Sequence, residues 1–255
     1  MKLSLATRIR PALIHFLISF TIAALAAVVV FKLWFPEPYD DMAGGSKLFV
    51  ILVSVDVVLG PLLTFVAFNP GKTRRHLAMD LSVIGLLQVA ALAYGLHTMA
   101  LARPVVLSAE NMMFRVVAAN GVKSDELPQA LPDFRSLSWT GPRLVGVRRS
   151  VSSAEMMQSV NIALQGYDVG SRPSYWLPYE QTRQQVIRQA SPLAPMADAS
   201  PWHRDAVAAA ARGVGRPASE LGVLPVLTRK TGWYALLDRK TGDVLGFARL
   251  DPAAQ

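Results

Sequence analysis

One acidic residue lies in the middle of a long apolar stretch, and it is the strongest candidate for chemistry in the chain. Asp56 falls within residues 48–68, which read LFVILVSVDVVLGPLLTFVAF. Crossing about 30 Å of hydrocarbon takes about 20 helical residues, so this stretch is long enough to span a bilayer. An acid at that depth costs on the order of 3 kcal/mol and should face protein or water. We therefore expect Asp56 to have a function in helix contact or in ion handling.

Two features close to Asp56 bear on that choice. Asp56, Gly60 and Thr64 recur at a spacing of four, which places them on one narrow, polar face of a helix. Pro61 removes one backbone donor, which predicts a kink just past the acid. The functional interpretation is a proton or ion site at a bent helix, and the structural one is a polar clamp between helices. We favour the clamp, because the sequence shows no second intramembrane acid or base at matching depth.

A partner for Asp56 is predicted in the next apolar stretch, residues 77–99. If the two stretches form a hairpin about residues 69–76, Gln88 lies at the depth of Asp56. Gln88 shares a helix face with Gly85, and small residues let helix backbones approach closely. We therefore expect Gln88 to hydrogen-bond to Asp56 across a close helix contact that includes Gly85.

The composition excludes several classes of protein. Hydrophobic residues make up 52% of the 255 residues, which favours a membrane protein. There is no cysteine, the four histidines are scattered, and no phosphate loop, His-Glu-x-x-His helix or nucleophile elbow is present. We therefore expect no enzymatic activity, no cofactor and no metal. The net charge of +8 is spread along the chain rather than clustered, so nucleic acid is not an expected partner.

Charge and hydropathy together predict a topology. Three apolar stretches, at about residues 12–35, 48–68 and 77–99, alternate with basic and acidic links. Lys2, Arg8 and Arg10 precede the first stretch, and the basic loop with Lys72 and Arg74 follows the second. The positive-inside rule then places the N-terminus in the cytoplasm and everything after about residue 103 outside. The acidic link after the first stretch should lie outside too, with Trp34, Phe35 and Tyr39 as aromatic anchors at the interface.

The remaining residues, 104–255, have the pattern of a water-soluble α+β domain. Short strands are expected at 105–107, 114–119 and 143–149, with a turn at 120–121. Helices are expected to start at Ser152 through a capping box, at Pro178 and at Pro201. Three β segments at 223–228, 232–237 and 244–250 are separated by turn sequences, which predicts an antiparallel meander.

An aromatic run in this domain allows two interpretations. Tyr175, Trp176 and Tyr179 alternate with prolines. Such a run can form an exposed platform that binds a partner, or it can form the packed plug of a small domain. The sequence leaves both open.

A set of motifs spans nearly the whole chain, at residues 34–39, 44–49, 55–64, 68–70, 80–95, 140–145, 172–180 and 233–242. In these motifs the chain resembles the TfpX/TfpZ family of type IV pilin accessory proteins. The resemblance implies a non-enzymatic protein of the bacterial inner membrane that promotes pilus assembly or shifts the balance of extension and retraction. It implies the major type IV pilin as partner, with the pilus assembly platform as a second. One departure is that residues 110–114 read ENMMF where the family pattern predicts an acidic residue, an arginine and a phenylalanine.

Two functions follow as hypotheses. In the first, the three helices receive the pilin's single membrane helix while the outer domain holds its globular head. In the second, the protein is a membrane sensor or a small ion-coupled transporter with Asp56 as the working site. An Asp56→Asn variant separates them, since a packing clamp tolerates a neutral isostere and a titrating site does not.

Overall fold

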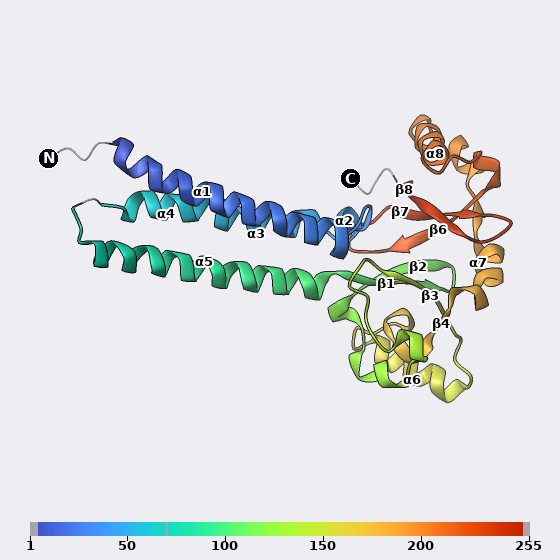
Figure 1. The fold of residues 1–255 in the computed structure, drawn as a ribbon. Helices are drawn as coiled ribbons and strands as arrows, with labels where there is room; N and C mark the ends of the chain where they lie inside the picture. The colour runs from blue at the N-terminus through green and yellow to red at the C-terminus, as the bar shows by residue number, and fades with distance from the viewer. Residues whose placement is uncertain (1–4, 70, 252–255) are drawn as a thin grey trace.

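Three long helices form one end of the molecule and a mixed sheet forms the other (Figure 1). The computed structural model describes residues 5–69 and 71–251, with side chains from Arg8 onward, so Lys2 and Pro70 lie outside the described residues. The helical runs Arg8–Trp34, Gly45–Ala67 and Arg74–Ala102 are long and apolar enough to cross a membrane. Each is a few residues longer than the apolar stretch that predicted it.

Two of these three spans contain a π-helical segment. The first span is α1 (Leu5–Val28) continued by the π-helix Val29–Trp34. The second is α3 (Gly45–Ser54), the π-helix Val55–Leu59 and α4 (Gly60–Ala67). The second π segment contains Asp56 and ends just before Pro61, whose missing N–H disturbs the regular hydrogen-bond pattern at this point. The helix thus has a π-helical turn at Asp56, and the kink expected just past this residue stays a prediction.

The third span, α5 (Arg74–Ala102), is one unbroken helix with defined ends. Its N-cap is Thr73, whose side chain accepts a hydrogen bond from the His76 N–H. Its C-cap is Arg103, which is extended because Pro104 follows it. The first strand begins at Pro104 itself, so a single residue separates the membrane helix from the sheet.

The outer part is α+β, as predicted, and its strands form one mixed sheet. The strand order is β4-β3-β1-β2-β6-β7-β8, with β5 paired to β6. Strands β1 and β3 are parallel, as are β2 and β6, and the other pairs are antiparallel. The strands are β1 (Pro104–Glu110), β2 (Met113–Ala118), β3 (Arg143–Val147), β4 (Trp176–Pro178), β5 (Ser191–Pro192), β6 (Leu221–Leu227), β7 (Trp233–Asp238) and β8 (Val244–Arg249).

The predicted C-terminal meander is confirmed as β6-β7-β8. Its second turn is held by Asp238, whose carboxylate accepts hydrogen bonds from the backbone N–H groups of Lys240 and Thr241. Gly242 follows with a φ of 74°, a left-handed conformation that favours glycine. The turn residues thus specified the hairpin correctly.

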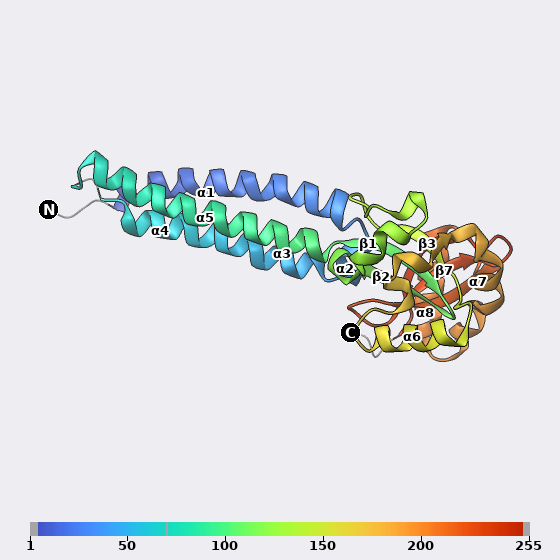
Figure 2. The same ribbon diagram turned by 90° about the horizontal axis from the view of Figure 1, so that it is seen from below.

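Three helices flank the sheet, and one prediction among them is wrong in part. The helices are α6 (Ser153–Ala163), α7 (Arg183–Gln189) and α8 (Pro201–Val214), seen from a second side in Figure 2. The Ser152 cap of α6 and the Pro201 start of α8 are confirmed, since Ser152 and Ser200 each accept a backbone hydrogen bond at the N-cap. The helix predicted from Pro178 instead begins at Arg183, because residues 176–178 pair with β3. The turn predicted at residues 120–121 is part of a short 3₁₀ segment, Ala119–Gly121.

The link between the first two spans packs against the outer domain. It contains the short helix α2 (Tyr39–Met42). The Met42 side chain is fully buried, and the Met42 carbonyl accepts hydrogen bonds from the Lys230 N–H at 3.1 Å and the Thr228 hydroxyl at 2.9 Å. Asp41 forms ion pairs with Lys230 and Arg249. The link is therefore attached to the meander.

This attachment corrects the expectation for two aromatic residues. Phe35 has no exposed surface and packs with Val30 and Met99. The Tyr39 ring meets Phe247 of β8 edge-on, with centroids 5.5 Å apart. Burial raises the pKa of the Tyr39 hydroxyl. Phe35 is thus packed among the spans, and Tyr39 joins their link to the outer domain, so neither is a membrane-interface anchor.

Candidate functional site

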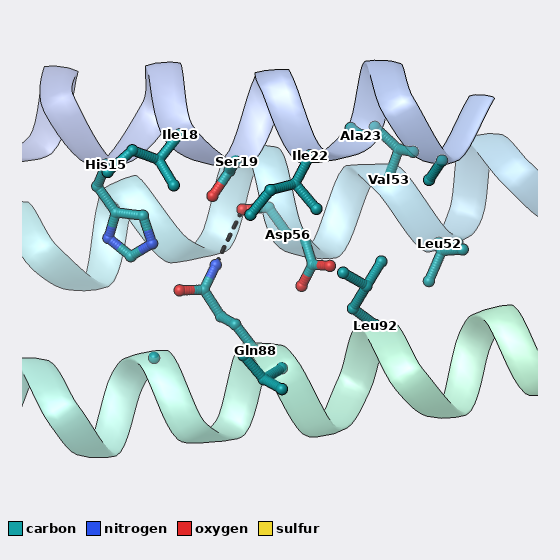
Figure 3. A pocket seen from close by; sticks show the side chains of 13 residues that line it. His15, Ile18, Ser19, Ile22, Ala23, Leu52, Val53, Asp56, Gln88 and Leu92 are labelled. Atoms are coloured by element: carbon teal, nitrogen blue, oxygen red, sulfur yellow. Dashed lines mark hydrogen bonds between the residues drawn. The ribbon is translucent and has the colours of Figure 1, made fainter. Parts of the chain in front are cut away.

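A cavity of about 160 Å³ lies between the three spans and contains Asp56 in its wall (Figure 3). Apolar side chains form most of the lining, and the polar members are His15 and Ser19 from α1, Asp56, and Gln88 from α5. The space is large enough to admit several water molecules or a side chain of another molecule. This cavity brings the predicted residues Asp56, Gly85 and Gln88 together.

Asp56 is buried in this wall with an unsatisfied oxygen. The residue is 8% exposed, and its Oδ1 has no hydrogen-bond partner among the described residues. Its carboxylate points toward α5, beside Leu92 (Figure 3). A buried acceptor without a partner costs about 1 to 3 kcal/mol, and more when it is charged. The site therefore favours a hydrogen-bond donor that enters the cavity.

Gln88 reaches Asp56 as expected, but its acceptor is the backbone. The Gln88 Nε2 donates to the Asp56 carbonyl oxygen at 3.1 Å, and the dashed line in Figure 3 marks this bond. The π-helical turn around Asp56 loosens the regular backbone ladder, which leaves a carbonyl for the side chain to use. The Gln88 Oε1, like the Asp56 Oδ1, has no partner among the described residues. Two residues that line the cavity thus carry buried acceptors without a partner.

Sequence reasoning missed His15, which lines the same cavity. Its Nδ1 lies 2.5 Å from the Thr64 hydroxyl, so the predicted polar stripe on the second span continues into a contact with α1. We expected no second acid or base at the depth of Asp56, and His15 lies instead at the level of Thr64, eight residues along the second span. The signal was available, since Thr64 lies two helical turns from Asp56 on the same face and needs a polar partner in a bilayer.

The two predicted glycines and Pro61 occupy different environments. Gly60 is buried, and a Cβ built on it would overlap the Gln88 side-chain amide, so its lack of a side chain admits the Gln88 contact. A Cβ added to Gly85 would meet no atom within 4 Å, and this residue borders the open cavity. Pro61 is half-buried in the first turn of α4. Among the described residues, no atom lies close enough to Gly85 to make the close contact between the second and third spans that we expected there.

The geometry of the cavity limits the chemistry it can support. Among the described residues no group of three or more His, Cys, Asp or Glu side chains is placed to hold a metal ion. The cavity offers acceptors within apolar walls, and such a site binds a hydrogen-bond donor on an otherwise apolar molecule. The arrangement is suited to recognition inside the membrane.

The aromatic run in the outer domain is a packed plug rather than an exposed platform. Tyr175, Trp176 and Tyr179 are 1%, 3% and 4% exposed. The Trp176 Nε1 donates to the Gly170 carbonyl at 2.8 Å, and the Tyr179 hydroxyl donates to the Gly242 carbonyl at 2.5 Å. Burial raises the pKa of Tyr179 to about 12. The expectation that these residues bind a partner is therefore corrected, because their polar atoms are used inside the domain.

Charged side chains surround Tyr175 and hold α6 to the sheet. The guanidinium groups of Arg148 and Arg172 lie 4.0 Å and 4.6 Å from the Tyr175 ring centre. Arg172 forms a buried ion pair with Glu126 at 2.9 Å. Arg148 pairs with Glu155, and hydrogen bonds from Arg148 and the Val151 N–H hold the pKa of Glu155 at about 2. This network has a structural role.

Residues 110–114, which lack the arginine of the family pattern, are followed directly by Arg115. Arg115 pairs with Glu110 at 2.5 Å and with Asp168 at 3.0 Å. Between the strands, Met112 has a φ of 66°, and its side chain is 61% exposed. Glu110 is thus paired with Arg115, which directly follows Phe114.

Comparisons with known proteins identify relatives of this chain. Residues 3–44 match a family model described as fimbrial assembly protein FimB. A fimbrial assembly protein of serogroup I from Dichelobacter nodosus is 40% identical over 181 residues, covering 71% of this chain and 70% of the relative. The serogroup E1 protein of the same organism is 39% identical over the same coverage, and the protein of serogroups C1 and C2 is 43% identical over 117 residues, covering 46% of this chain and 89% of that relative. No solved structure matches.

Proposed function

This chain belongs to the family of fimbrial assembly proteins, and from that premise we propose that it is a non-enzymatic accessory protein of type IV pili that binds the major pilin. The proposed site is the intramembrane cavity, which receives the pilin's hydrophobic helix before the subunit enters the fibre. The protein then promotes pilus assembly or modulates extension and retraction.

The observation that carries this proposal is the pair of unsatisfied acceptors in the cavity wall. The Asp56 Oδ1 and the Gln88 Oε1 lack partners among the described residues, while the rest of the lining is mainly apolar. A membrane helix with a hydrogen-bond donor at this depth would supply a partner for these acceptors and an apolar surface for the rest of the lining. Gly85 leaves open space beside these residues, into which a neighbouring helix can pack.

The proposal includes a location and an orientation. We place the protein in the bacterial inner membrane, with the N-terminus and the loop between the last two spans in the cytoplasm. Arg8, Arg10, Lys72, Arg74 and Arg75 support this orientation through the positive-inside rule. The α+β part, residues 104–255, is then a periplasmic domain beside which the pilin head can stand.

Site-specific photocrosslinking in cells tests the proposal. A photoreactive amino acid at Leu92, which lines the cavity, should capture the major pilin. The matched control is Leu86 on the same helix, which is 72% exposed away from the other spans and should capture far less. If pili assemble while neither Leu92 nor another cavity position captures pilin, the proposed binding site is wrong.

His15 gives the second candidate function its support. A histidine and an acid in one intramembrane cavity are the components of a proton or ion site, as a sensor or ion-coupled transporter requires. Asp56→Asn separates the two functions. If the cavity only recognises a helix, piliation is retained in this isostere, whereas a titrating site loses its function.

A further inference from the structure

One loop of the outer domain contacts the outer ends of two spans. Trp139 lies in this loop, and its ring centre is 6.4 Å from that of Trp34. The guanidinium carbon of Arg103 lies 3.9 Å from the centre of the Trp139 ring. Trp34 is the last residue of the first span, and Arg103 directly follows the last residue of the third. Trp139 is therefore level with the ends of both spans.

The backbone of this loop is fixed independently of the Trp139 side chain. The Arg103 Nε donates to the Ser138 carbonyl at 3.2 Å, and Arg103 itself is only 6% exposed. Gly141 has a φ of 74°, and a Cβ added there would lie 2.8 Å from the Pro36 ring. The loop is thus held through Ser138 to the residue that follows the third span, and through Gly141 to Pro36 in the link after the first span.

Despite these contacts, Trp139 is mostly exposed. It is 61% exposed, whereas Trp176 in the core of the same domain is 3% exposed. An exposed tryptophan at the end of a membrane helix is in the environment that tryptophan prefers, because the ring enters the headgroup region while its N–H stays near water.

We propose that Trp139 inserts into the headgroup region of the outer-facing leaflet and anchors the outer domain to the lipid surface. The partner is the bilayer in which the three spans are embedded, so the surface continues the membrane contact of those spans. Lys32 supports this assignment, because it is exposed near the end of the first span and has no ion pair among the described residues. An ammonium group there can reach lipid phosphates.

The absence of cysteine from the chain allows a direct depth measurement. Thr140→Cys places a spin label beside Trp139 and leaves the tryptophan in place. The full chain is reconstituted in phosphatidylethanolamine and phosphatidylglycerol vesicles without any other protein. Leu86→Cys serves as the reference in hydrocarbon, and Leu164→Cys, 83% exposed after α6, serves as the reference in water.

The proposal predicts an intermediate position for the label. Its collision rate with a water-soluble nickel chelate should fall well below that at Leu164 and stay above that at Leu86. Adding Trp139→Ala to the Thr140→Cys variant should raise the collision rate of its label toward the Leu164 value, while the Leu86 reference stays unchanged. A label at Thr140 that is as accessible as at Leu164 in vesicles overturns the proposal.

A protein partner at this loop is a distinct outcome of the same experiment. If the label is shielded only after purified pilin is added to the vesicles, Trp139 contacts pilin and the lipid proposal is wrong. Because the vesicles otherwise contain no pilin, this test does not depend on the proposed pilin binding.

Discussion

At the scale of single residues, glycines determine how the polar side chains between the spans are packed. Gln88 reaches the Asp56 carbonyl because Gly60 leaves room for its amide, and the cavity persists partly because Gly85 leaves its wall open. Two glycines with the same sequence signal therefore have opposite structural roles. One of them permits a contact, and the other borders a space.

Gly60→Ala should destabilise the packing of the spans. The added methyl group displaces the Gln88 amide from its hydrogen bond, and overpacking of this kind costs about 1 to 3 kcal/mol. The thermal midpoint of the detergent-solubilised protein is the measurement. Gly85→Ala is the matched control on the facing helix and should not lower the midpoint, because nothing lies within 4 Å of the added methyl group and alanine favours the helix. Equal midpoints for the two variants would contradict this assignment.

Glu155 should make the outer domain sensitive to acid. Its pKa of about 2 in the folded protein is below the usual value of about 4.3. A depressed carboxyl pKa contributes stability that is present above about pH 4.3 and is lost as pH falls toward about 2. The unfolding midpoint of Glu155→Gln should therefore lie below that of the parent protein at about pH 6, and the difference should shrink on acidification. A difference that stays constant down to about pH 3 would show that Glu155 acts only through neutral contacts.

At the scale of elements, the local signals in the sequence predicted more than the long-range ones. The spans, the Ser152 cap and the meander follow from hydrophobic length, capping chemistry and turn residues, which depend on near neighbours. The parallel pairings of β1 with β3 and β2 with β6 were not predicted, since no local pattern specifies them. The same holds for residues 176–178, where pairing with β3 replaced the start of a predicted helix.

In the candidate site, too, features with a local sequence signal could be predicted, and features that depend on long-range packing could not. The stripe of Asp56, Gly60 and Thr64 and the facing Gln88 could be predicted, because helical spacing and hairpin depth are regular. The backbone acceptor of Gln88, the cavity and the contribution of His15 could not, because they depend on a π-helical turn and on how α1 packs. The burial of Tyr175 likewise depends on contacts with Ser159 and Arg148, which are distant in sequence.

The link containing α2 should be sensitive to truncation of its buried methionine. Met42 has no exposed surface, and loss of a buried methionine side chain typically costs about 2 to 5 kcal/mol. Met42→Ala should lower the thermal midpoint and increase proteolysis within residues 37–44. Met157→Ala, at a residue that is 64% exposed, is the control and should change stability by less than about 0.5 kcal/mol. Unchanged proteolysis in Met42→Ala would show that the remaining contacts of Tyr39, Asp41 and the Met42 carbonyl are enough to hold the link.

At the scale of the whole molecule, the orientation proposed for the spans can be measured with single cysteines. A membrane-impermeant maleimide should label Leu164→Cys in intact spheroplasts, because the outer domain is placed in the periplasm. It should label Gly71→Cys only after the membrane is opened, since Gly71 lies beside Lys72 in the basic loop. The reverse labelling pattern would contradict the orientation.

The junction at Arg103 has a mechanical consequence for the whole molecule. A single residue joins the third membrane helix to β1, and β1 lies inside the sheet between β3 and β2. Because the junction is one residue long, a change in the orientation of the helix is transmitted directly to the sheet. When the helix tilts to match a thinner or thicker bilayer, the sheet swings through an arc above it. Conversely, a lateral force on the outer domain is transmitted to α5, which carries Gln88 in the wall of the cavity.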